Sequence, residues 1–151
     1  MCAITLILII IIVEQHLING GFKEIVHTAD LSLKVWATEL SALFTISAQG
    51  MFSLMKISMC KSEPNYIEVN INEIDLECLL VKFLSFLLEE IQKNAVVYDI
   101  QNILFAKNSL SATLRGFPII LVQRDIKAVT FHNLEVIYEK GTYQATLVFD
   151  I

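Results

Sequence analysis

An amphipathic segment from Leu76 to Gln92 limits the possible folds more than any other part of this sequence. Its large apolar side chains recur every three or four residues, which is the spacing of one helix face. Asp75 stands directly before it, where an aspartate side chain caps the free N–H groups of a first helical turn. The apolar stripe is broad, so we expect a sheet to cover it. Its members are Leu79, Leu80, Phe83, Leu84, Leu87, Leu88 and Ile91.

Several segments show the alternation of apolar and polar residues that is typical of strands. A turn at Lys107-Asn108 is predicted to join two of them into a hairpin, and Lys140-Gly141 is predicted to join the last two. Gly116-Phe117-Pro118 is expected to interrupt the strand before it. The predicted strands are residues 31–36, 67–72, 96–105, 109–115, 126–130, 134–138 and 143–151.

A second helix is predicted from Glu39 to about Met55, with Thr38 as its cap and Gly50 weakening its middle. Strands outnumber helices and follow one another in hairpins, which favours antiparallel pairing. The sequence therefore predicts an α+β fold of two layers, a mostly antiparallel sheet of about six strands with two main helices packed on it.

Composition excludes some classes of function. Apolar residues make up 55% of the 151 residues and charged residues 18%, which argues against disorder. The net charge is −5 and Lys and Arg form no run, so tight binding of RNA by this chain alone is not expected. The three cysteines form no CxxC pair and are odd in number, so neither a disulfide framework nor a zinc knuckle is expected, and a reducing compartment is favoured.

The N-terminal segment Ala3–Val13 is almost entirely apolar. It is shorter than the roughly 20 residues that a membrane-spanning helix needs, and it lacks the basic start of a secretion signal. Its β-branched residues suit a strand or a vestigial tail, so a membrane anchor is not expected. We predict that residues 1–21 form an extension of unknown role and residues 22–151 the folded domain.

Motifs of catalysis are missing from the sequence. The five glycines form neither a GxGxxG nor a GxxxxGK loop, and no HExxH pattern or nucleophile motif is present. The sequence therefore does not indicate an enzyme. Polar groups that a purely structural chain would not need occur instead near residue 30, near residue 130 and at Asp150.

The alternation in the last predicted strand places Asp150 on the face opposite Phe149, where burial is poor. Ile151 follows directly, so we expect its carboxyl group beside the Asp150 side chain. Crowded oxygen atoms of this kind attract hard divalent cations, and Asp30 is a candidate third ligand. The alternative is that Asp150 is a solvated residue at a frayed end and Asp30 a turn former.

Three further residues are candidates for a functional role. His27 and His132 have side chains that ligate metals or titrate near neutral pH, although unlinked histidines are more often ordinary hydrogen-bonded side chains. Lys127 lies in a predicted strand and by itself indicates only a solvated residue.

Read together, four short motifs resemble the archease family in their order along the chain. They are His27-Thr28-Ala29-Asp30, Gly50-Met51-Phe52, Ile126-Lys127-Ala128-Val129-Thr130-Phe131-His132 and Val148-Phe149-Asp150-Ile151. The Leu-rich segment after Asp75 also resembles the family at the same place. The resemblance covers residues 22–151.

The resemblance implies a cytoplasmic accessory protein, not an enzyme, that activates the RtcB-type RNA ligase of tRNA splicing and RNA repair. It implies that the chain promotes guanylylation and turnover of the ligase and meets RNA only through it. A family metal site, usually assigned to calcium, maps onto Asp30, Asp150 and Ile151. A functional lysine of the family maps onto Lys127, and His132 is the second functional candidate.

Two other functions remain open from the sequence. One is a metal-dependent hydrolase that uses Asp30, Asp150 and His132. The other is a chaperone-like modulator of RNA-modifying enzymes, for which the high apolar content is the only support in the residues.

Overall fold

The computed structural model describes residues 4–6, 19–26 and 29–151 of the chain. This part holds two helices, α2 (Leu40–Met55) and α3 (Leu76–Asn94), and ten strands. The strands are β1 (Ile4–Leu6), β2 (Gly20–Val26), β3 (Leu31–Ala37), β4 (Ile57–Cys60), β5 (Asn65–Asn72), β6 (Val96–Ala106), β7 (Ser109–Val122), β8 (Ala128–Thr130), β9 (Ile137–Glu139) and β10 (Thr142–Asp150).

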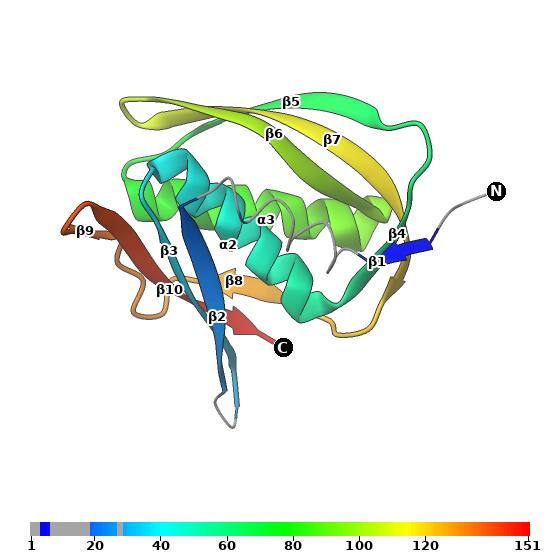
Figure 1. Ribbon diagram of the computed structural model, residues 1–151, viewed down its shortest axis with the longest axis horizontal. Helices are drawn as coiled ribbons and strands as arrows, with labels where there is room; N and C mark the ends of the chain where they lie inside the picture. Colours follow the sequence, from blue (N-terminus) through cyan, green and yellow to red (C-terminus); the bar gives the residue numbers. More distant parts are fainter. Residues whose placement is uncertain (1–3, 7–18, 27–28) are drawn as a thin grey trace.

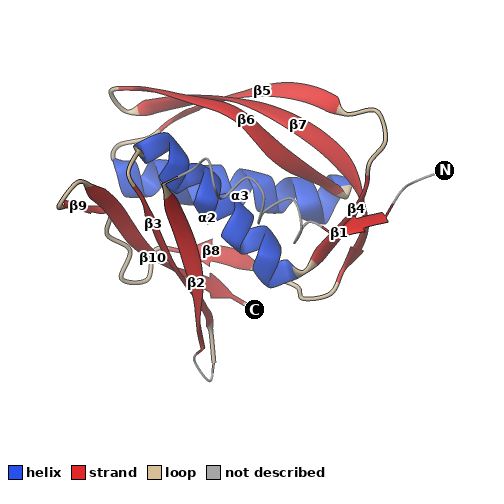
Figure 2. Cartoon of the chain, in the orientation of Figure 1, coloured by secondary structure: helices blue, strands red, loops and turns tan. Residues whose placement is uncertain are grey.

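The strands form two antiparallel sheets with the helices between them (Figure 1). The first sheet has the order β1-β4-β7-β5, with β6 also paired to β7. The second has the order β2-β3-β10-β8, with β9 also paired to β10. Figure 2 shows both helices in the space between the sheets, and both contact strands of each sheet. The predicted α+β class with antiparallel pairing is confirmed, and the strands divide into two sheets instead of one.

Helix α3 has the predicted start and apolar face. The Asp75 side chain accepts a hydrogen bond from the N–H of Cys78 at 2.7 Å, which caps the first turn and lowers the pKa of Asp75. Every member of the predicted apolar stripe is buried. The helix ends at Asn94, because Ala95 takes a left-handed conformation with φ of 52°.

Helix α2 is more fully buried than α3, with 10 of its 16 residues buried against 8 of 19 in α3. Its N-cap position is Glu39, whose side chain makes no capping hydrogen bond, so the predicted cap at Thr38 was wrong. The N–H of Thr38 donates to the carbonyl of Asn19 instead. Gly50 is needed despite its low helix propensity, because a Cβ there would overlap the Leu33 side chain of β3.

Strand β7 runs through the expected interruption at Gly116–Pro118 and ends at Val122. A Cβ at Gly116 would lie 2.8 Å from the Tyr98 ring, so the glycine serves close packing, not a turn. Pro118 lies beyond the end of β5, which pairs only as far as Gly116, so its missing N–H breaks no bond to that strand.

The C-terminal strands are shorter than predicted, except the last. β8 begins at Ala128 and β9 covers only Ile137–Glu139, while β10 ends at Asp150. The turn between β9 and β10 is the predicted one, with positive φ at both Lys140 and Gly141.

Most of the predicted extension 1–21 lies outside the described residues. Within it, β1 pairs with β4, and Gly20-Gly21 opens β2. None of the helices in the described ranges combines the length and the apolar character that crossing a bilayer requires.

Candidate functional site

Two aspartates far apart in the sequence meet at one end of the second sheet. Leu31 of β3 pairs with Phe149 of β10. Continuing this antiparallel register by one residue places Asp30 opposite Asp150. On its other side Asp150 pairs with Ala128 of β8. The ends of β3, β10 and β8 therefore bring Asp30, Asp150 and the start of β8 together.

The main chain of Lys127 is fixed at this end of the sheet. Its N–H donates to the carbonyl oxygen of Asp150 at 2.7 Å. The Lys127 side chain is exposed and forms no ion pair with any residue of the described ranges. The main chain of Lys127 therefore lies against the end of β10, and its exposed side chain is available to contact another molecule.

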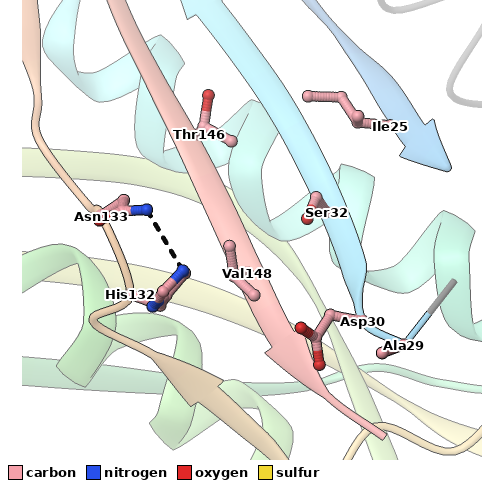
Figure 3. Close-up of a pocket in the computed structure, with 8 residues that line it drawn as sticks. All are labelled: Ile25, Ala29, Asp30, Ser32, His132, Asn133, Thr146 and Val148. Atoms are coloured by element: carbon pink, nitrogen blue, oxygen red, sulfur yellow. Dashed lines mark hydrogen bonds between the residues drawn. The ribbon is translucent and has the colours of Figure 1, made fainter. Parts of the chain in front are cut away.

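Both carboxylates lie on the outer face of the sheet, away from the helices. Along β10, Ala145, Leu147 and Phe149 are buried, whereas Asp150 is exposed, so the alternation predicted for this strand is confirmed. Asp30 is exposed too, and Figure 3 shows its carboxylate beside the end of β10.

A hollow of about 460 Å³ opens next to Asp30 on this face. Polar groups from three elements line it, as Figure 3 shows. The Ser32 residue is only 5% exposed, and its hydroxyl makes no hydrogen bond to any described residue. The lining residues are Ile25, Ala29, Asp30, Ser32, His132, Asn133, Thr146 and Val148.

His132 stands on the rim of the hollow and is held by its neighbours. Its N–H donates to the Thr130 hydroxyl at 3.3 Å, and that hydroxyl donates to the carbonyl of Val148 at 2.9 Å. The His132 Nε2 atom lies 3.2 Å from the side-chain Nδ2 of Asn133. The main chain of Asn133 has a positive φ of 51°. The loop after β8 therefore orients the imidazole toward the hollow.

Three polar residues of this hollow were not predicted from the sequence to be part of a site. Ser32, Thr146 and Asn133 line the same hollow as Asp30 and His132. Ser32 and Thr146 were detectable as polar residues in the outward phase of their strands, but nothing in the sequence shows that β3 and β10 are neighbours. His27 lies outside the described residues. Ile151 follows Asp150 and is 46% exposed.

The donor set at this end suits a hard cation. Asp30 and Asp150 supply carboxylate oxygens, and the main-chain oxygens of Ile151 lie one residue further on; Ca²⁺ takes six to eight such ligands. Within the described ranges no three side chains of His, Cys, Asp or Glu gather as a metal-binding group. A cation here would thus need main-chain oxygens and water besides the two aspartates.

Sequence and structure comparisons agree on one family. Residues 22–151 match the archease protein family (MTH1598/TM1083). The chain is 28% identical over 144 residues to Protein archease of Thermococcus kodakarensis, covering 83% of this chain and 94% of that protein. It is 32% identical over 146 residues to Protein archease of Sulfolobus acidocaldarius, covering 86% and 98%.

Two solved structures share the fold. The solution structure of protein 1598 of Methanobacterium thermoautotrophicum superposes with a TM-score of 0.63 at 24% identity, covering 87% of this chain and 99% of that one. The crystal structure of a Thermotoga maritima protein titled "an archease, possible chaperone" gives a TM-score of 0.63 at 22% identity, covering 85% and 96%. With the family match over residues 22–151, these findings establish that the chain belongs to the archease family.

Proposed function

We propose that this protein is a cytoplasmic accessory factor that activates an RtcB-type RNA ligase by promoting its guanylylation and turnover. The observation that carries the proposal is the meeting of Asp30, Asp150 and Lys127 at one exposed end of the second sheet, in a chain of the archease family. In this proposal that end, the acidic tip, enters the active site of the ligase, and the ligase performs the chemistry.

A divalent cation, which we propose to be Ca²⁺, would be held at the acidic tip by Asp30, Asp150 and the Ile151 main-chain oxygens. When bound, it supplies positive charge that offsets the repulsion of two neighbouring carboxylates. The fold of the chain sets the positions of these ligands. The register between β3 and β10 fixes the spacing of the two aspartates, and the hydrogen bond from Lys127 to Asp150 fixes the last residues of β10.

The side chains around the acidic tip suit contact with a protein partner. Lys127 presents an ammonium group for a carboxylate of the ligase or for a phosphate in the ligase active site. Phe131 is 58% exposed and His132 stands on the rim of the adjacent hollow. A large exposed aromatic beside charged groups is typical of an interface centre, where aromatic anchors supply much of the binding free energy.

A ligase guanylylation assay with purified Asp150→Ala protein tests the proposal. We expect the variant to lose most of the stimulation that the wild type gives. Glu68→Ala is the matched control, because it also removes one exposed carboxylate from a strand but lies on the first sheet. Stimulation by Asp150→Ala at the wild-type level would contradict the proposal.

A chaperone-like role is the second candidate, because the Thermotoga maritima neighbour of the same fold is titled a possible chaperone. In that case the protein would suppress the aggregation of an RNA-modifying enzyme and leave ligation unchanged. Light scattering of a heated methyltransferase, with and without this protein, separates the two roles. A metal-dependent hydrolase would instead turn over phosphoester substrates without any partner.

A further inference from the structure

The outer face of the second sheet carries another group of charged residues, beyond the acidic tip. Lys23 of β2 and Lys34 and Trp36 of β3 surround a hollow of about 470 Å³, together with Thr142 and Gln144 of β10. The helices lie on the opposite, inner face of this sheet (Figure 1). We call this hollow the lysine–tryptophan pocket.

The two lysines stand in an unfavourable position. Lys23 and Lys34 are direct partners in the antiparallel register of β2 and β3. Such partners have Cβ atoms about 4.5 to 5.5 Å apart, and like charges placed this way destabilise a sheet. Neither ammonium group forms an ion pair within the described ranges. The chain has 16 acidic residues, yet none lines this hollow. An anion bound between the lysines would remove the repulsion.

Trp36 forms a rigid platform beside the lysines. It pairs with Gly21 of β2, and a Cβ on Gly21 would lie 2.9 Å from Cζ2, 3.3 Å from Cε2 and 3.5 Å from Cη2 of the indole. One side of the ring therefore lies against the glycine, where any larger residue would displace it. The residue is half-buried and also lines the hollow. The ring is thus held in place and still offers surface to a ligand.

We infer that the lysine–tryptophan pocket binds a short segment of single-stranded RNA. A phosphate lies between the Lys23 and Lys34 ammonium groups, and the adjoining base stacks on Trp36. Thr142 and Gln144 supply hydrogen-bonding groups for the edge of the base. Paired cations beside an aromatic ring are the recurring arrangement for single strands, in which stacking is tolerant of sequence. A hollow of this volume accommodates a nucleotide.

Binding of RNA at this pocket would extend the proposed function. The identification of the ligand as RNA rests on that proposed function. Lys34 lies four residues along β3 from Asp30, which is about 13 Å, on the same outer face. Trp36 lies about 20 Å away. An RNA strand that leaves the ligase surface beside the acidic tip would therefore reach the pocket. With a net charge of −5, the chain binds RNA weakly and needs the ligase to hold the other end.

Trp36 is the only tryptophan in the chain, so its fluorescence reports on the pocket directly. We expect a six-nucleotide single-stranded RNA to quench this fluorescence in the isolated protein at low salt. Neutralisation of one phosphate predicts that the logarithm of the binding constant falls with the logarithm of salt concentration with a slope of about −0.7. Absence of quenching at low salt in folded protein would overturn the inference.

Charge reversal at the pocket gives a second test. Lys34→Glu is expected to weaken binding roughly tenfold and to flatten the salt dependence. Lys107→Glu is the matched control, since it makes the same change of charge at the exposed turn between β6 and β7. Equal weakening by both variants would show general charge attraction in place of a site, and the inference would fail.

Trp36→Leu and Trp36→Phe test the platform, with anisotropy of a labelled RNA as the measurement. We expect the leucine variant to weaken binding at least about fivefold and the phenylalanine variant to retain most of it. Circular dichroism establishes that both are folded. Equal binding by all three proteins, or equal quenching of wild-type Trp36 by an acidic peptide, contradicts the assignment to RNA.

These measurements need no ligase, so they are independent of the proposed function. If the RNA fails to bind while Asp150→Ala abolishes ligase stimulation, only the inference about the pocket is wrong. If the RNA binds the pocket while Asp150→Ala stimulates normally, the proposed action of the acidic tip is wrong.

Discussion

The outer faces of the two sheets differ in how their charged side chains are paired. On the first sheet, Arg115 of β7 forms an ion pair of 2.5 Å with Asp99 of β6, and its guanidinium lies 5.3 Å from the centre of the Phe117 ring. On the second sheet, like charges lie side by side. Lys23 is opposite Lys34 in the pairing of β2 and β3, and at the far end Asp30 and Asp150 follow directly after the last pair of β3 and β10, Leu31 with Phe149.

This difference distinguishes charged residues that stabilise the fold by pairing with each other from charged residues that we expect to bind a ligand. The charges of a partly buried pair such as Arg115 and Asp99 are neutralised within the chain. Like charges on adjacent strands raise the free energy of the folded protein unless another molecule binds between them. The second sheet is therefore the face on which we expect ligands to act.

The largest effect is expected for calcium at the acidic tip. A ligand at 100 times its dissociation constant stabilises a protein by about 2.7 kcal/mol. We predict that calcium raises the melting temperature of the wild type and leaves that of the double variant Asp30→Asn and Asp150→Asn unchanged. Differential scanning calorimetry with and without the ion gives the measurement.

In the absence of calcium, the same double variant shows whether the two aspartates repel each other or stabilise the fold. It removes two repelling charges, so we expect it to be at least as stable as the wild type in the presence of a chelator. A loss of stability there would mean that the two aspartates hold the fold together, as Arg115 and Asp99 do.

The second effect concerns the first sheet. Arg115→Met removes the ion pair with Asp99 and the contact with Phe117, and we expect the free energy of unfolding to fall by about 1 to 2 kcal/mol. Urea denaturation measures this change. RNA binding and ligase stimulation should be unaffected, with Lys107→Met as a neutral surface control. If Arg115→Met lost ligase stimulation while still folded, the division between the two faces would be wrong.

A smaller effect is expected at Tyr98, on the inner side of β6. Its hydroxyl donates to Glu90 of α3 at 3.1 Å, and burial, followed by this hydrogen bond, raises the pKa of Tyr98 to about 12. The unfolded tyrosine ionises near pH 10, so the protein loses stability as the pH rises from about 10 to 12. Tyr98→Phe should cost about 1 kcal/mol at neutral pH and flatten this alkaline loss.

Urea midpoints between pH 7 and 11 test the Tyr98 prediction. Tyr138→Phe is the control, because Tyr138 is 61% exposed and makes no hydrogen bond through its hydroxyl within the described ranges. An alkaline loss of the same steepness in Tyr98→Phe and in the wild type would assign the effect to other groups.

The smallest expected effect is a gain. Lys34→Glu converts a like-charged cross-strand pair into an opposite one, so the free energy of unfolding should rise by roughly 0.2 to 1 kcal/mol at low salt. The same variant is expected to bind RNA more weakly. A variant that is more stable and binds less would mark Lys34 as a functional residue; a loss of stability would show that the lysine has a structural role.

Local patterns in the sequence were sufficient for the elements with strong periodicity. Helix α3 begins after Asp75 as predicted, because its cap and apolar stripe lie within one continuous segment. The alternation of β10 was also correct, since each residue of a strand faces the side opposite to its neighbour. From the same alternation, Asp150 could be placed on the outer face.

Features that depend on distant segments could not be predicted. The division into two sheets follows from which strands pair, and β3 and β10 are separated by more than 100 residues of sequence. The sequence raised the meeting of Asp30 and Asp150 as a hypothesis, and only the register of those strands places them opposite each other. Gly116 and Pro118 resemble a loop locally, but the close approach of Tyr98 and the end of β5 let β7 continue.

The position of the two helices between the sheets has a consequence for how the molecule unfolds. Each helix contributes to the interior of both sheets, so neither sheet retains a core once the other has separated. We therefore expect a single cooperative unfolding transition, with amide hydrogens of β3 and β7 exchanging at similar rates through the same global opening. The strands that hold the acidic tip are then as persistent as the strands farthest from it.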